Sequence, residues 1–440
     1  MLYQSGLCKL KSGKNTMSNA NTSLRQAVRA FTLNYGDPIK HLNSLLEQDP
    51  NNNIAVLLKA WMLVLSNDGP SLAKARKLVA GLTTDKLTQR ENGHLRALEL
   101  ALNNQWPSAV AVLDRHLMED PHDLIGHQCA LRLDGYQGRF HREAGRAARA
   151  LPFWSKEDPD YGIMLSFYGF GLEELGDFSR AEDISREAAE LEPYGYWPHH
   201  AVSHVMEMTG RPREGLKWMD SREALWNGAN CSNRVHIWWH KALFFIELGQ
   251  FDKALAIYDE EILPVMRPVA TQLCNPTALL WRLELLGLDA GSRWQDLLPL
   301  WHEQLAGMYS PFNEIHAAMS ALKANDCPAY NSILKNMKGR GQGNSELAPA
   351  YNEVAVPIAE AMNKFVNGDY KEALDGLLPV QGSLWRMGGS IAQRDLIEWT
   401  MVEAGIRAGE KNVAMSLVNE RLSSRPDSFI NARFMGDIGK

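Results

Sequence analysis

The sequence is poor in cysteine. Its 440 residues include five cysteines, which are widely scattered and form no CxxC pair. This excludes a disulfide framework and a zinc knuckle, both of which need closely spaced cysteines. Free thiols persist in a reducing environment, so we expect a cytoplasmic protein. The five are Cys8, Cys129, Cys231, Cys274 and Cys327.

Long apolar runs and an excess of positive charge are also missing. No segment approaches the roughly 18 apolar residues that span a bilayer, and the N-terminal segment has no apolar core of signal-peptide type. The formal net charge is -6, whereas nucleic-acid-binding proteins usually carry a basic face. We therefore expect no membrane partner and no nucleic-acid partner. Residues 1–20 are expected to form a disordered extension.

The familiar catalytic signatures are absent as well. The chain has no Walker loop, no dinucleotide fingerprint after a strand, no GxSxG motif and no kinase motif set. An enzymatic function is thereby narrowed to metal-dependent or acid–base chemistry.

The chain is instead rich in helix formers that alternate with short glycine-containing turns. Gly176 and Gly210 are 34 residues apart, which is the period of the tetratricopeptide repeat, and Gly249 and Gly368 mark similar turns. Within one such unit the small residues Gly169 and Ala181 and the closing Pro193 match the repeat pattern. The sequence therefore predicts an all-α solenoid, a superhelix of stacked helix hairpins.

Irregular composition suggests how the superhelix is divided. Residues 338–350 are rich in glycine, serine and proline, and we interpret them as a loop or linker. The predicted organisation is a superhelix with a histidine-rich groove over residues 21–337 and further hairpins over residues 351–440.

Several sequence blocks carry a resemblance to a known family. The blocks GFGLEELGDFSRAEDISREAAEL, HAVSHVMEMTGRPREGLKWM, WWHKALFFIELGQFDKALAIYDEEIL, LLWRLELLG and GGSIAQRD occur in this order. Together they resemble the tetratricopeptide repeat protein 38 family over most of residues 25–430. The resemblance implies an α-superhelix but no established general activity.

In tetratricopeptide repeats the first helix of each hairpin lines the concave groove. Aligned on Gly210 and Gly249, the groove-lining positions fall on two histidine pairs with i,i+4 spacing and on one glutamate. Imidazole and carboxylate are ligands for zinc and iron. One interpretation is therefore a site for a divalent transition metal, zinc or iron, held by His200, His204, Glu207, His236 and His240.

The same residues have two other interpretations. His204, Glu207 and His236 can act as catalytic groups, with or without a metal. Alternatively, all the histidines are hydrogen-bonded packing residues along a polar groove.

Further groove-side residues are candidates for contacts with a ligand. Histidine and tryptophan can line a pocket, and arginine can clamp a carboxylate or phosphate. The candidates are His94, Trp239, Arg282, His316 and Arg394. The alternatives are hairpin packing for the aromatic residue and salt bridges between hairpins for the arginines.

Three functions remain open. The groove can bind a small molecule or a peptide in a pocket lined by histidine and aromatic residues. The groove can instead be the active site of a metal-dependent or acid–base enzyme that acts on a small molecule. The chain can also be an interaction scaffold without a site, and its oligomeric state is open.

Overall fold

The fold is an α-solenoid of antiparallel helix hairpins, as the repeat pattern predicts. The structure is a computed structural model and describes residues 19–82, 87–305 and 307–438. The predicted disordered extension over residues 1–20 lies almost entirely outside this part of the chain. In the described residues the four cysteines, Cys129, Cys231, Cys274 and Cys327, are free. None of the described helices has the length and hydrophobicity that a membrane span needs.

The N-terminal half consists of hairpins that stack in chain order. Their helices are α1 (Asn19–Leu33), α2 (Pro38–Gln48), α3 (Asn53–Ser66), α4 (Gly69–Ala80), α5 (Gln89–Leu102), α6 (Trp106–Glu119), α7 (Leu124–Tyr136), α8 (Arg142–Ala150), α9 (Tyr161–Glu174), α10 (Phe178–Leu191), α11 (Tyr196–Met208) and α12 (Pro212–Trp226).

The C-terminal half continues the stack. Its helices are α13 (Arg234–Glu247), α14 (Phe251–Ile257), α15 (Ala270–Leu285), α16 (Arg293–His302), α17 (Pro311–Lys323), α18 (Cys327–Gly341), α19 (Ala348–Ala350), α20 (Val356–Val366), α21 (Tyr370–Leu377), α22 (Ile391–Arg407), α23 (Lys411–Ser424) and α24 (Phe429–Ile438).

Local sequence explains where the helices begin and end. Thr88 and Ser390 each start a helix through a capping box with the residue three positions later. Gly176 and Gly210 follow the first helix of their hairpins with φ values of 86° and 68°. Glycine adopts this left-handed conformation with the least strain, so these turns lie where the sequence places glycine.

Small residues allow the two helices of a hairpin to pack closely. A Cβ atom on Gly169 of α9 would lie 2.2 Å from Oγ of Ser185 on α10. Ala181 of α10 is completely buried. The repeat therefore predicts these contacts correctly, because a larger side chain at either position would separate the helices.

The segment predicted as a linker is shorter than expected. Helix α18 continues through Gly341 and α19 begins at Ala348, so the connection covers residues 342–347. It rests on an earlier hairpin, where Ser345 Oγ donates a hydrogen bond to the Asn104 carbonyl. The division of the chain into two blocks at this segment stays a prediction.

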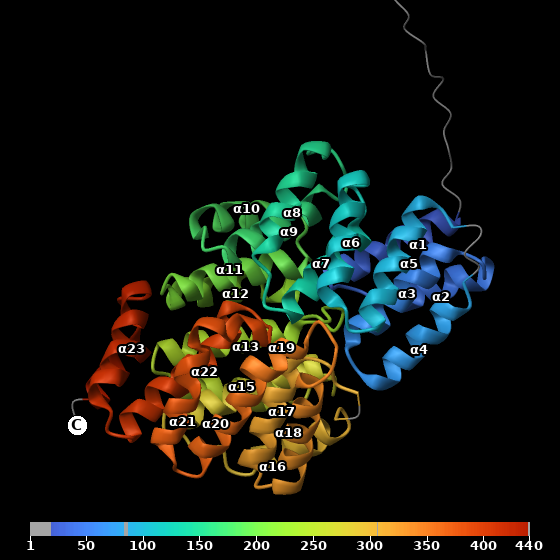
Figure 1. Ribbon diagram of the computed structural model, residues 1–440. Helices are drawn as coiled ribbons and strands as arrows, with labels where there is room; N and C mark the ends of the chain where they lie inside the picture. The colour runs from blue at the N-terminus through green and yellow to red at the C-terminus, as the bar shows by residue number, and fades with distance from the viewer. Residues whose placement is uncertain (1–18, 83–86, 306, 439–440) are drawn as a thin grey trace, which may run out of the picture.

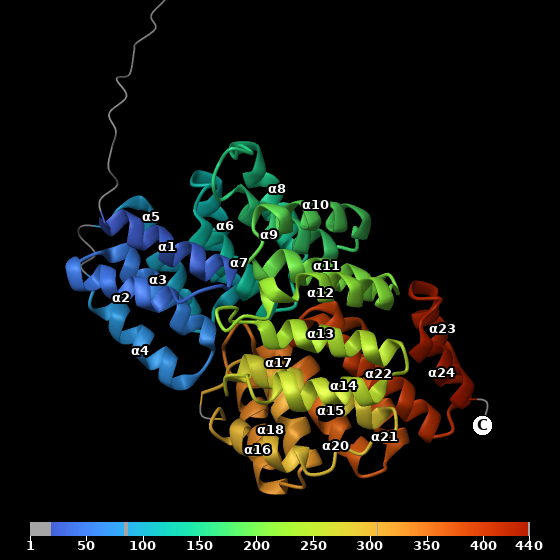
Figure 2. The same ribbon diagram turned by 180° about the vertical axis from the view of Figure 1, so that it is seen from behind.

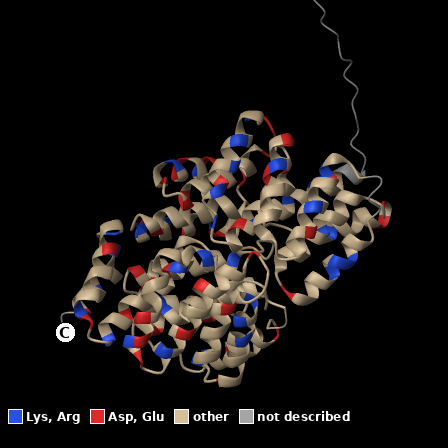
Figure 3. Cartoon of the chain, in the orientation of Figure 1, with Lys and Arg blue, Asp and Glu red and all other residues tan. Residues whose placement is uncertain are grey.

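The solenoid curves so that distant segments meet (Figures 1 and 2). Helix α22 packs against α15 and also contacts α11. The Gly389 amide donates a hydrogen bond of 3.0 Å to the Gly135 carbonyl at the end of α7. Lysine and arginine are interspersed with acidic residues along the visible helices (Figure 3). The curved solenoid surrounds a cavity that is bordered by α7, α9, α11, α13, α15, α17 and the segment before α22.

Candidate metal centre

Four histidines from two neighbouring helices meet in the interior. His200 and His204 lie on α11, and His236 and His240 lie on α13. Each residue can offer one ring nitrogen such that all four nitrogens lie within 4.8 Å of one another. We call this set the histidine tetrad. The i,i+4 spacing directs each pair to one face, and the solenoid packs α11 against α13.

Two tetrad members are oriented by polar partners. Asn275 Nδ2 donates to the Gln272 carbonyl, which leaves Asn275 Oδ1 to accept from His236 Nδ1 at 2.6 Å. His240 Nδ1 lies 2.9 Å from Glu207 Oε2. These contacts leave the two Nε2 atoms facing each other at 3.2 Å.

The other two members have no hydrogen-bond partner among the described residues. Both ring nitrogens of His200 and both of His204 are buried without one. His204 Nδ1 is 3.2 Å from Glu173 Oε2, but the two groups are not aligned for a hydrogen bond. Buried polar groups normally find a partner. Other buried histidines among the described residues, such as His127, His199 and His316, leave one ring nitrogen unpaired, whereas His200 and His204 each leave both.

Burial determines the charge of the tetrad. It lowers the pKa of His236 to about 3 and the pKa values of His200 and His240 well below the usual range. These imidazoles are therefore neutral near pH 7, the form in which histidine binds a metal. Burial raises the pKa of Glu207 to about 7. The pKa of the buried Glu173 carboxyl lies well above its usual range for the same reason.

A cavity of about 110 Å³ reaches the tetrad at His200 and His236. Its walls include the aromatic residues Phe170, Tyr196 and Trp197. A second cavity of about 480 Å³ shares several lining residues with the first. The shared residues are Arg132, Asn233, Thr271 and Gln272. The two cavities therefore adjoin.

The remaining candidates for the tetrad region take supporting positions. Glu207 contacts Nδ1 of His240, and its carboxylate is not among the four ligand atoms of the histidine tetrad. Trp239 is fully buried and stacks on the His236 ring at 5.2 Å. Arg282 is buried over the Trp239 ring and donates to the Ala392 carbonyl at 2.8 Å. Neither Trp239 nor Arg282 lines the cavity beside the tetrad.

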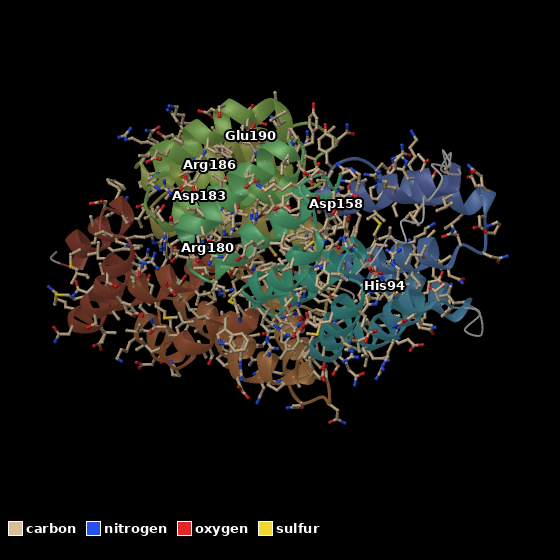
Figure 4. The ribbon with its side chains drawn as sticks, turned by 90° about the horizontal axis from the view of Figure 1, so that it is seen from above. His94, Asp158, Arg180, Asp183, Arg186 and Glu190 are labelled. Carbon is tan, nitrogen blue, oxygen red and sulfur yellow. The ribbon has the colours of Figure 1, made fainter. Side chains whose placement is uncertain are left out.

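His94 lies outside this site. It is on α5 among the N-terminal hairpins, apart from the green helix α10 that carries Arg180 and Asp183 (Figure 4). Trp61 Nε1 donates to His94 Nδ1 at 3.1 Å, and His94 Nε2 lies 2.7 Å from Asp123. Both ring nitrogens of His94 thus have partners on neighbouring hairpins, so His94 links these hairpins to one another.

His316 and Arg394 are also engaged elsewhere. His316 Nδ1 donates to the Phe312 carbonyl at 2.8 Å, one turn earlier on α17. Arg394 donates to the Gly389 carbonyl, and its charge faces the buried Glu173 and Glu174 carboxyls. Neither residue lines the cavity.

Sequence reasoning missed three residues of the region: Arg132, Glu173 and Asn275. Arg132 comes from α7, Glu173 from α9 and Asn275 from α15. No local motif marks them. The only available signal is that each lies on the first helix of a hairpin, where groove-lining residues are expected.

Comparison with models of known protein families gives no match. The resemblance to the tetratricopeptide repeat protein 38 family therefore stays a prediction. Among solved structures, the Cut9 and Hcn1 hetero-tetramer of APC/C aligns over 95% of this chain and 74% of the other, with 15% identity and a TM-score of 0.43. The chain is similar to tetratricopeptide-repeat proteins at this coarse level.

Two further similar structures are human IFIT1 dimers. One, with PPP-AAAA, aligns over 98% of this chain and 95% of the other at 12% identity and a TM-score of 0.42. The other, with m7Gppp-AAAA, covers 96% and 90% at 12% identity and a TM-score of 0.43. The prediction that excluded a nucleic-acid partner was wrong, since these two similar structures contain PPP-AAAA and m7Gppp-AAAA. The likeness itself concerns the fold alone.

Proposed function

We propose that the protein binds one divalent transition metal ion, zinc or iron, through the histidine tetrad, beside a cavity that takes a small molecule. The observation that carries the proposal is the convergence of four imidazoles, three of them buried and that of His236 half-buried, whose nitrogens lie within 4.8 Å of one another. Imidazole nitrogen is a preferred ligand for both metals.

A shared proton is the main alternative to a metal. A proton on His240 Nε2 can satisfy the contact of 3.2 Å with His236 Nε2. It leaves His200 and His204 without partners among the described residues. Each buried polar group left unsatisfied costs about 1–3 kcal/mol. A metal ion takes one nitrogen from each of the four rings, so it reduces the unpaired nitrogens of His200 and His204 from four to two, which favours it over the proton.

The distances and the surrounding groups also support a metal. Zinc–nitrogen bonds of about 2.0–2.1 Å place neighbouring nitrogens in a tetrahedron roughly 3.3 Å apart. The Nε2 atoms of His236 and His240 lie close to that separation, at 3.2 Å. Metal-bound histidines usually donate their other N–H to a carboxylate or carbonyl, and Glu207 and Asn275 are placed to accept.

The adjoining cavity supports a function beyond simple metal storage. His200 and His236 border it, so a molecule inside would lie next to the ion. A bound ion that accepts a fifth ligand beside the four imidazoles would act as a Lewis acid that polarises an oxygen of that ligand. At about 110 Å³ the cavity suits a small molecule better than a peptide. We therefore favour a small-molecule ligand over a peptide.

Metal analysis of the purified full-length protein tests the proposal. We expect about one zinc or iron per chain and its loss in the variant His204→Ala/His236→Ala. His199→Ala is the matched control, because His199 is a buried neighbour on α11 that bonds the Pro193 carbonyl instead. The absence of metal, with no uptake when zinc or iron(II) is added to folded protein, would overturn the proposal.

A further inference from the structure

Arg132 of α7 is a cation without an anionic partner. In the part of the chain that the structure describes, no carboxylate lies within salt-bridge distance of its guanidinium. Its side chain donates to the Tyr136 hydroxyl at 3.3 Å and lies over that ring. Arg146, on the next helix, instead pairs with Asp134 at 2.6 Å and with Asp114 at 2.8 Å.

The Arg132 side chain borders both interior cavities. The described residues that line the smaller cavity include no aspartate or glutamate. Their neutral polar groups are carboxamides and hydroxyls, for example Asn233, Gln272 and Asn313. The fixed charge at this cavity is therefore positive, which favours an anionic ligand.

Aromatic rings form the apolar part of the same cavity. Tyr196 stacks on His200 at 4.8 Å, and Phe170 packs against Trp197 at 5.0 Å. Phe312 adds a further ring to the lining. An apolar cavity of about 150 Å³ accepts benzene. The cavity of about 110 Å³ adjoins the second one of about 480 Å³ along shared lining residues, so we expect an aromatic ring with one substituent to fit there.

We propose that this cavity binds a small aromatic monocarboxylate, whose carboxylate pairs with Arg132 while its ring lies among the aromatic walls beside His200 and His236. Guanidinium and carboxylate match in charge and in bidentate geometry. The inference deepens the proposed function, since it names the class of molecule beside the metal. The contact with Arg132 itself does not require the ion.

Calorimetric titration with benzoate tests the inference. Benzoate is expected to bind the full-length protein, and the neutral isostere benzamide is expected to bind at least ten-fold more weakly. Arg132→Gln should weaken benzoate binding at least ten-fold, because a charge-assisted pair is lost. Arg139→Gln is the matched control, since Arg139 packs on Trp385 and does not line the cavity.

Repeating the titrations after removal of metal separates the two proposals. Binding that depends on Arg132 in metal-free protein supports the inference even if the tetrad takes no ion. Binding that needs metal and is unchanged in Arg132→Gln overturns the inference but supports the metal centre. No binding of benzoate or phenylacetate to either form overturns it too. The comparison of benzoate with benzamide in metal-free wild-type protein decides the question even if Arg132→Gln does not fold.

Discussion

Asn275 fixes the orientation of His236. The amide oxygen of Asn275 lies 2.6 Å from His236 Nδ1, and its amide nitrogen is committed to the Gln272 carbonyl. His236 must therefore donate from Nδ1 and keep the lone pair on Nε2. That lone pair points toward His240. Asn275 thus presents the Nε2 lone pair of His236 to the centre of the tetrad, where the proposed metal ion would bind.

Removal of this contact should weaken metal binding without abolishing it. In Asn275→Ala the His236 ring loses the partner that sets its tautomer. Loss of such a supporting contact typically lowers metal affinity by about 10–100-fold. The affinity can be measured by competition with a chelator of known strength, and saturation at one ion per chain should still be reached.

Asn233→Ala is the matched control for this change. Asn233 lines the same cavity but forms no side-chain hydrogen bond with the tetrad. Its replacement should leave the metal affinity unchanged. Equal losses in the two variants would show that Asn275 acts only through the shape of the cavity.

Asp395 is the ionic centre of the C-terminal hairpins. Although burial would raise the pKa of Asp395, Arg421 and Arg425 hold that pKa well below its usual range. Arg421 lies 2.6 Å and Arg425 2.9 Å from its carboxylate. Asp395→Ala should destabilise these hairpins by about 3–5 kcal/mol, because the buried Arg421 and the half-buried Arg425 lose the carboxylate that they share. Hydrogen exchange should rise in α22, α23 and α24.

Glu398→Ala provides the comparison for Asp395. Glu398 contacts the same Arg421 at 2.8 Å, but its side chain is 41% exposed. Exposed ion pairs contribute about 0–1 kcal/mol, so the effect should be much smaller. Similar exchange rates in the two variants would contradict the central role of Asp395.

The helical fold and the histidine tetrad could both be predicted from the sequence. Gly176 and Gly210 mark the period of the repeat, and that period assigns the histidines to groove-lining helices. His200 and His236 then become neighbours because α11 and α13 pack side by side in the solenoid. The repeat pattern alone is therefore sufficient to predict that these histidines lie close together.

The cavity could not be predicted in the same way. It depends on contacts between distant segments, such as the hydrogen bond from Gly389 to Gly135. The curvature of a solenoid results from small rotations between repeats that accumulate along the chain. No local sequence motif specifies the total rotation. A prediction based on groove-side position alone therefore selected His94 and His316, which pack among the helices away from the cavity. It missed Arg132, which lines the cavity.

Gly171 allows a close approach between two hairpins. A Cβ atom there would lie 2.2 Å from the backbone nitrogen of Ala144 on α8, and a backbone atom cannot move aside easily. Gly171→Ala should lower the free energy of unfolding by roughly 1–3 kcal/mol through overpacking. Chemical denaturation monitored by circular dichroism measures this loss.

Gly339→Ala tests whether the effect is steric. Gly339 is exposed on α18, and an added Cβ would meet no atom of its surroundings. This substitution should stabilise the helix by about 0.5–1 kcal/mol, because alanine loses less backbone entropy on folding. A similar loss of stability in both variants would argue against the predicted clash.

His316 should make the stability of the fold sensitive to acid. Burial lowers the pKa of His316 to about 4, and the charge of Arg282 adds to this effect. An unfolded histidine titrates near pH 6.5. Between these values the unfolded state binds the proton and the folded state does not, so stability falls as the pH decreases from about 6.5 to 4. The contribution is about 1.4 kcal/mol per pH unit.

The variant His316→Gln removes this proton uptake and leaves the other buried histidines in place. Urea unfolding at pH 6 and pH 5 should therefore show a smaller loss of stability for the variant, by about 1.4 kcal/mol, than for the wild type. Ser320→Ala is the control, because Ser320 is buried on the same helix and does not titrate. That variant should shift both values equally. An unchanged slope in His316→Gln would mean that His316 is already protonated, or exposed to water, in the folded state.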